Sequence, residues 1–189
     1  MKAENHRQLA IYLADKYISD APRRYIRAFK LGCVEPDKNF TTYFKGSIKH
    51  QWMRGHNWDN MSRYIRRTSR KLERKEYLRL LDYYKLGKLI HYVADAFTLA
   101  HNDFFEKNLK KHRSYERRLE EYFSFHLQQY RHKTDDLYDS VIDLICSYHN
   151  EYINKPRSIH TDASFCIKVC SIVLDILLKV QEEPIYAVL

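Results

Sequence analysis

The chain has 189 residues, with 33 Lys and Arg against 24 Asp and Glu, a formal net charge of +9 at pH 7, and only four Gly and four Pro. This length fits one hydrophobic core, so we expect residues 1–189 to form a single domain, and the low Gly and Pro content excludes a turn-rich β fold. The positive charge favours anionic partners such as phosphates, nucleic acid or an acidic membrane surface, and does not choose among them.

Apolar residues recur at helical spacing along most of the chain, with little strict alternation, which predicts an all-α bundle. The stretch from 33 to 57 breaks this pattern with Pro36, Gly46 and Gly55, and we expect a long irregular segment there. Loops of this length in compact domains usually have a function. The predicted helices span residues 5–18, 22–32, 58–72, 75–102, 113–130, 135–152 and 164–181.

The N-terminal residues, the length of the apolar runs and the four cysteines bear on the cellular location. The N-terminal residues lack the apolar core and cleavage site of a secretory signal, and no apolar run reaches membrane-spanning length. The four Cys show no metal-type spacing; Cys166 and Cys170, four apart in an apolar segment, are typical of core thiols in a reducing compartment. We expect a cytoplasmic protein, unless the sequence is a trimmed form of a secreted one.

Five imidazole and carboxylate side chains between residues 91 and 116 carry most of the functional information. Both types of side chain suit Zn²⁺, and two of them four apart on a helix project to the same side, so each such pair can hold one ion. On a continuous helix, His101 would be turned roughly 120° from Asp95 and would face a different ion. The five are His91 with Asp95, then His101, then His112 with Glu116.

Spacing alone does not establish a metal site, because His132 and Asp136 repeat it in a very polar run, where a solvated helix face is the default interpretation. His91 and Asp95 differ because their neighbours are apolar, and a charged Asp on a mostly apolar helix needs a buried partner or an ion. The competing interpretation of this pair is a hydrogen bond within the core.

Several segments resemble motifs of the bacterial zinc-dependent phospholipase C family, an all-helical fold that holds three zinc ions in a cleft. YKLGKLIHYVADAFTLAH, residues 84–101, is similar to the family's signature helix, in which an Asp follows the first His by four residues and a second His comes six later. HRSYE at 112–116 resembles the next motif. LGCVEPD at 31–37 resembles the segment with the active-site Asp, and NHRQLA at 5–10 resembles the first-helix His.

The resemblance implies the zinc ligands residue by residue. One zinc would be held by His91, Asp95 and a His from the preceding loop, for which both His56 and His50 qualify; we favour His56 because a helix begins directly after it. A second zinc would be held by His101, His112 and Glu116. A third would use His6 and share Asp95. Secreted members begin with a Trp whose amine and carbonyl complete that third site, whereas this sequence begins MKAEN, so we expect two or three ions per chain.

The implied activity is hydrolysis of a phospholipid or smaller phosphodiester by metal-activated water. Asp37 would be the general base or orient the water, the alternative being a Pro-Asp turn. Trp52 and Trp58 are candidates for substrate stacking. Two other functions stay open: a zinc-dependent single-strand nuclease, since zinc nucleases share this fold and the charge suits a polyanion, and a non-catalytic helical protein that retains structural zinc or binds anions.

Overall fold

The structure is a computed structural model that describes residues 1–38, 58–102, 109–127, 138 and 140–179, and none of these residues lies in a strand. The all-α fold is therefore confirmed. The described helices are α1 (Ala3–Tyr17), α2 (Arg23–Lys38), α4 (Trp58–Glu73), α5 (Leu80–Ala96), the short 3-10 helix η1 (Leu99–His101), α6 (Leu109–His126), α7 (Val141–Ile153) and α8 (Ile159–Lys179).

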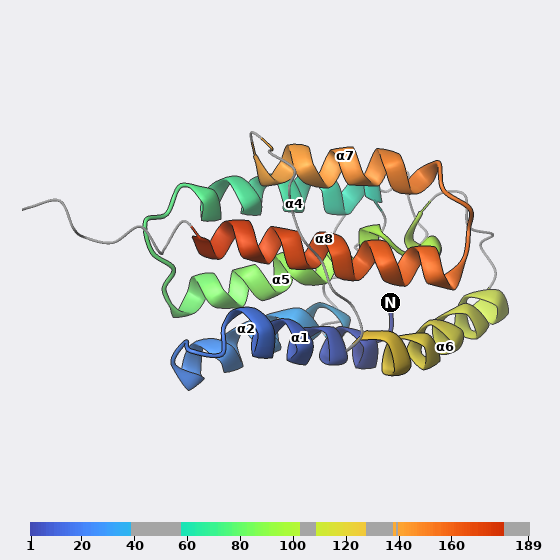
Figure 1. Cartoon of the computed structure of the whole chain (residues 1–189), viewed down its shortest axis with the longest axis horizontal. Helices are drawn as coiled ribbons and strands as arrows, with labels where there is room; N and C mark the ends of the chain where they lie inside the picture. The colour runs from blue at the N-terminus through green and yellow to red at the C-terminus, as the bar shows by residue number, and fades with distance from the viewer. Residues whose placement is uncertain (39–57, 103–108, 128–137, 139, 180–189) are drawn as a thin grey trace, which may run out of the picture.

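The helices stack in layers around α5 and α8, which run through the middle of the molecule (Figure 1). α4 and α7 lie side by side on one face of this central pair, and α1 and α2 lie on the other. α6 extends beside the start of α1 and packs on α8. The buried apolar side chains of the seven α-helices in the described ranges form one core cluster, and α5 is buried over most of its length because helices contact it on several sides.

α2 and α5 touch backbone to backbone where Gly32 faces Gly87. A Cβ atom added to Gly32 would lie 2.2 Å from the carbonyl oxygen of Tyr84, and one added to Gly87 would lie 2.1 Å from that of Phe29. Both distances are far below van der Waals contact, so only glycine fits at either position. This close approach aligns the C-terminal half of α2 with the part of α5 that carries His91.

Two predicted boundaries are wrong, and both corrections affect the functional region. α2 does not end at Gly32 but continues through Pro36 to Lys38, so Asp37 lies in a helix and the irregular segment does not begin at residue 33. Pro36 removes one backbone donor, but packing against α5 stabilises the added turn. α5 is not continuous to residue 102 but ends at Ala96, and η1 follows.

Side chains explain the break after Ala96. The hydroxyl of Thr98 donates to the carbonyl oxygen of Asp95 at 2.8 Å, and the side-chain amide of Asn102 donates to the carbonyl oxygens of Ala96 and Thr98 at 3.1 and 2.8 Å. These donors satisfy carbonyl groups that a longer helix would have bonded to its own backbone. The chain therefore turns back toward Asp95 instead of continuing straight.

The other helix ends differ from the predicted ones by a few residues. α6 begins at Leu109 rather than 113, and α8 begins at Ile159 rather than 164. α7 begins at Val141, where the Ser140 side chain caps it by accepting from the backbone N–H of Asp143. None of the described helices combines the length and the hydrophobicity needed to cross a bilayer. The C-terminal residues 180–189 and the pair His132 and Asp136 lie outside the described residues.

Candidate metal centre

The candidate centre is built around Asp95, which is completely buried and lies in the last turn of α5. Side chains from α1, the end of α2, η1 and α6 converge on it although they are far apart in sequence. All predicted site residues that have an imidazole or carboxylate and lie in the described ranges belong to this group. The group consists of His6, Asp37, His91, Asp95, His101, His112 and Glu116.

The two oxygens of Asp95 face different partners. Oδ1 lies 3.2 Å from Nε2 of His6 and 3.7 Å from Nε2 of His101, while Oδ2 lies 3.3 Å from Nε2 of His91. The rings of His6 and His91 stack with their centroids 3.8 Å apart. Of the described residues, His6, His91 and Asp95 form a group of ligand atoms close enough together to hold one metal ion.

Asp37 completes one edge of the group. Its Oδ1 lies 3.7 Å from Nε2 of His91 and its Oδ2 lies 3.8 Å from Nε2 of His6. Oδ2 is buried and makes no hydrogen bond within the described part of the chain. A buried carboxylate oxygen without a donor is costly in an apolar surrounding, and a cation or water beside it would remove that cost.

The orientation of His91 follows from a hydrogen bond behind it. Its Nδ1 lies 2.9 Å from the carbonyl oxygen of Cys33, which can only accept, so Nδ1 carries the proton and donates. In the neutral imidazole, Nε2 then presents its lone pair toward Asp95 and Asp37. A ring N–H donated to a backbone carbonyl is the usual way in which proteins fix a metal-binding imidazole.

His101 is oriented by a comparable device. Its Nδ1 lies 2.7 Å from the Thr98 hydroxyl, which already donates its only proton to the Asp95 carbonyl oxygen. The hydroxyl must therefore accept from Nδ1 of His101, which leaves Nε2 as the lone-pair nitrogen facing Asp95. The prediction that His101 would be turned roughly 120° from Asp95 and face a different ion assumed a continuous helix, and the turn at Thr98 removes that assumption.

A second pair lies on the inner face of α6. Nδ1 of His112 is 3.4 Å from Oε2 of Glu116, as the four-residue spacing predicted, and the ring of His112 lies 6.3 Å from that of His101. Between this pair and Asp95 lies the terminal amine of Met1, which donates to Oδ1 of Asp95 at 2.7 Å and is 3.9 Å from Oε1 of Glu116. Side-chain spacing carries no signal for this amine, which only the family resemblance had indicated.

Burial and charge together set the protonation of the centre. Burial, aided by the neighbouring His91, lowers the pKa of His6 to about 4, so this ring is neutral at pH 7. Burial alone would raise the pKa of Asp95, but His101, the terminal amine and the other imidazoles hold it well below its ordinary value. Asp95 is therefore ionised and His6 neutral, the states in which each can coordinate a metal. For His91, burial alone would lower the pKa, but Asp95, Asp37 and the Cys33 carbonyl raise it, so this ring would release a proton when a metal binds.

These side chains fit zinc by chemistry and by spacing. Two donors that each lie about 2.0–2.1 Å from a tetrahedral zinc ion are about 3.3 Å apart. The distances from Asp95 to His6 and His91 are 3.2 and 3.3 Å, and that from His112 to Glu116 is 3.4 Å. The unbonded oxygen of Asp37 supports the same conclusion. Such ligands also accept other first-row ions, so the fit defines a class of metals.

The remaining predicted residues stand apart from this group. His56, its alternative His50, and Trp52 lie outside the described residues. Trp58 stacks on the imidazole of His149 with a centroid distance of 3.7 Å and an angle of 7° between the ring planes. His149 in turn bonds to Oδ1 of Asn102 at 3.0 Å, so Trp58 is linked to η1 rather than to the ligands themselves.

Sequence reasoning overlooked the residues that orient the ligands. The carbonyl of Cys33 carries no signal in the sequence, because any residue would supply it. The hydroxyl of Thr98 could have been recognised, since a Thr directly after a helix often bonds to the backbone of the last turn.

Most of the chain is similar to one family of known proteins. A family model described as zinc dependent phospholipase C matches residues 6–159. Neither a curated protein nor a solved structure matches the chain. The matched span begins at His6 and contains every imidazole and carboxylate of the centre.

Proposed function

The chain belongs to the zinc-dependent phospholipase C family, and on that premise we propose that it is a zinc-dependent hydrolase that cleaves the phosphodiester bond of a phospholipid or a smaller phosphodiester. The observation that carries the proposal is the surrounding of Asp95: three imidazole nitrogens lie 3.2, 3.3 and 3.7 Å from its oxygens inside the core. A hydrogen bond within the core would require only one His beside the Asp, whereas three imidazoles surround this carboxylate.

The ligands divide into two groups, and Asp95, a member of the first, also lies 3.7 Å from His101 of the second. His6, His91 and Asp95 would hold one ion, and His101, His112 and Glu116 would hold a second. His50 or His56 would add a further ligand. Bound zinc lowers the pKa of water and neutralises charge that develops on a phosphoryl group. The protein holds Nε2 of His91 and of His101 toward the centre through the Cys33 carbonyl and the Thr98 hydroxyl.

Asp37 would act as the general base. Its carboxylate lies at the edge of the centre with 13% of the side chain exposed, so a water molecule can reach it. In the hydrolysis, the water oxygen forms a new bond to phosphorus while Asp37 takes one proton of that water, and the bond from phosphorus to the alcohol oxygen breaks as that oxygen receives the proton back from Asp37. Placing this carboxylate beside His6 and His91 would hold the water near the ester that is cleaved.

The first experiment compares Asp95→Asn with Asp82→Asn. Asp82 is also buried on α5, about 20 Å away along the helix axis, where it accepts from Lys75 and from the backbone of Arg79. Elemental analysis of protein purified without added metal should give two or three zinc ions per chain in the wild type, most of them lost in Asp95→Asn and retained in Asp82→Asn. Activity on a phosphodiester panel should follow the zinc content.

The panel also separates the competing functions. It contains phosphatidylcholine, phosphatidylserine, a small aryl phosphodiester and single-stranded DNA and RNA. Cleavage of nucleic acid alone would replace the proposal by a nuclease. Bound zinc without any hydrolysis would indicate a structural metal. A folded wild-type protein that contains no zinc and binds none would overturn the proposal.

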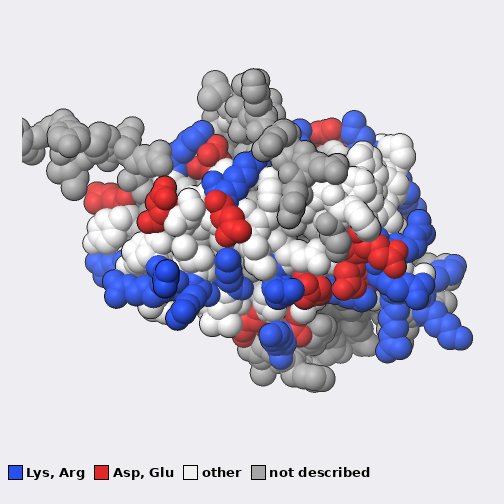
Figure 2. Space-filling view, turned by 60° about the horizontal axis from the view of Figure 1, so that its bottom comes forward, with Lys and Arg blue, Asp and Glu red and all other residues white. Residues whose placement is uncertain are grey.

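We further propose an anionic phospholipid surface as the partner of α6. Five cationic side chains on this helix are exposed, and Figure 2 shows Lys and Arg gathered at the end of the molecule where α6 lies. The same helix carries His112 and Glu116 on its inner face. Positive charge next to the metal ligands supports an anionic substrate surface. The five are Lys110, Lys111, Arg113, Arg117 and Arg118.

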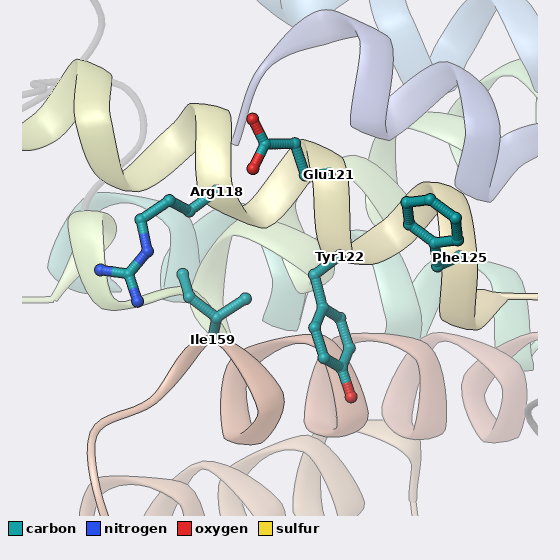
Figure 3. A pocket seen from close by; sticks show the side chains of 5 residues that line it. All are labelled: Arg118, Glu121, Tyr122, Phe125 and Ile159. Atoms are coloured by element: carbon teal, nitrogen blue, oxygen red, sulfur yellow. The ribbon is translucent and has the colours of Figure 1, made fainter.

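A shallow groove between α6 and the start of α8 adds an apolar element to this surface. Its volume is about 320 Å³, and Figure 3 shows Arg118 and Tyr122 extending from α6 toward Ile159. Phe125, which also lines the groove, is 75% exposed. An exposed aromatic ring on a helix that also carries exposed cations is typical of proteins that rest on a lipid surface.

A further inference from the structure

We propose that Asp162, in the first turn of α8, is a positioning residue for the metal ligand His101, because it holds the backbone of η1 in the place that directs His101 at the centre. The proposal rests on the proposed function, since it concerns the same metal ligands. Among the described residues, the Asp162 side chain makes no hydrogen bond to an imidazole of the centre; it acts through Leu99, two residues before His101.

Asp162 is 1% exposed, and its side chain accepts hydrogen bonds from three other helices. Its Oδ2 accepts the backbone N–H of Leu99 at 3.1 Å and the hydroxyl of Tyr115 on α6. Its Oδ1 accepts the hydroxyl of Tyr152 on α7 at 2.8 Å. One carboxylate thus joins η1, α6, α7 and α8 at a single buried point.

The bond to Leu99 matters because η1 is a single turn. A 3-10 turn of three residues has little stability of its own, and its first N–H has no partner inside the turn. The N–H of Leu99 is also 3.2 Å from the Tyr115 hydroxyl, which is itself bonded to Asp162. Without the carboxylate, Leu99 and both tyrosines lose their common acceptor inside the core.

The effect would reach the metal through Thr98 and His101. Thr98 directly precedes Leu99, and its hydroxyl fixes the tautomer of His101 by accepting from Nδ1 at 2.7 Å. A shift of η1 by a few tenths of an ångström changes both this hydrogen bond and the direction of Nε2. Outer partners of this kind typically change metal affinity by about 10–100-fold when they are removed.

The test measures zinc affinity by competition with a chromophoric chelator. Asp162→Ala should weaken zinc binding at the site that contains His101 by about 10–100-fold. Asp82→Ala is the matched control, because it removes another buried carboxylate that accepts a backbone N–H at the start of a helix. This control should keep the wild-type affinity.

A double substitution separates positioning from general destabilisation. In a His101→Ala background, Asp162→Ala should cause no further loss of zinc affinity, because the residue on which it acts is gone. An equal loss in both backgrounds would overturn the proposal. If Asp162→Ala fails to fold, Tyr115→Phe removes one hydroxyl from the same network and should give a smaller loss that also disappears in the His101→Ala background.

Failure of this inference is distinguishable from failure of the proposed function. Wild-type zinc affinity in Asp162→Ala or in a folded Tyr115→Phe would overturn the role of Asp162 and leave the zinc hydrolase standing. A wild-type protein that binds no zinc would overturn both.

Discussion

Burial keeps the imidazoles of His6 and His149 neutral, in different surroundings. Burial lowers the pKa of both His6 and His149 to about 4, with a further contribution from His91 in the case of His6. His6 faces the carboxylates of Asp37 and Asp95, whereas His149 is enclosed by the rings of Trp58 and Phe97 and bonds to Asn102. A neutral imidazole is thus ready for a metal at His6 and serves packing at His149.

His149 predicts a pH dependence of stability. Its pKa is about 4 in the folded protein against 6.5 when exposed, so between these values the unfolded chain binds more protons, and the free energy of unfolding falls as the pH drops from 6.5 toward 4. The loss from this residue is at most about 3 kcal/mol. Urea unfolding of metal-free protein at pH 7 and pH 4.5 should show a smaller difference in His149→Phe than in the wild type.

The exposed His126 provides the control for that measurement. His126→Phe should keep the wild-type pH dependence. If His149→Phe keeps it as well, His149 does not control stability in this range, and the buried His6 would be the next residue to test by the same measurement.

At the scale of elements, the contact between α2 and α5 determines whether Asp37 and the Cys33 carbonyl reach His91. Gly87→Ala would place a methyl group 2.1 Å from the carbonyl oxygen of Phe29, a backbone atom that cannot rotate away. We expect the free energy of unfolding to fall by about 1–3 kcal/mol, because overpacking exceeds the gain in helix propensity. Zinc affinity should fall too, since the two helices must separate at the point that supports the ligands.

Urea unfolding and chelator competition would measure both effects. Lys85→Ala, an exposed change on the same helix, is the control and should alter neither quantity by much. A Gly87→Ala variant as stable as this control would show that the two helices can move apart at little cost.

At the scale of the molecule, the net charge of +9 is distributed over several surfaces, and the prediction is that α6 matters most for lipid binding. Changing Lys110, Arg113 and Arg117 to Glu should weaken binding to phosphatidylserine vesicles by about 100-fold, at about 1 kcal/mol per cation. The control changes the exposed Arg23, Arg24 and Arg27 of α2 to Glu. Each substitution alters the charge by two, so both variants have a formal charge of +3.

Vesicle co-sedimentation at two salt concentrations would compare the variants. We expect wild-type binding to weaken with salt, because exposed charges are screened. Equal losses in the two variants would mean that total charge, not α6, determines lipid binding. Binding to neutral phosphatidylcholine vesicles that equals binding to phosphatidylserine would contradict the role of charge altogether.

The sequence by itself determined what local geometry controls. Apolar spacing predicted the all-α fold and most helices, since periodicity is a property of each segment. The pairs His91 with Asp95 and His112 with Glu116 were predictable for the same reason, because a helix puts residues four apart on one side. The resemblance in motifs extended this to His6 and Asp37, and the match over residues 6–159 confirms the family.

Tertiary structure alone decided how these parts meet. The continuation of α2 past Pro36 brings Asp37 to His91, and the break after Ala96 turns His101 back toward Asp95. Neither could be predicted from local propensity: Pro36 is tolerated because α2 packs on α5, and η1 is held by Asp162 from a helix about 60 residues later in the chain. A metal centre depends on such long-range contacts, because its ligands come from separate elements and only packing sets the distances between them.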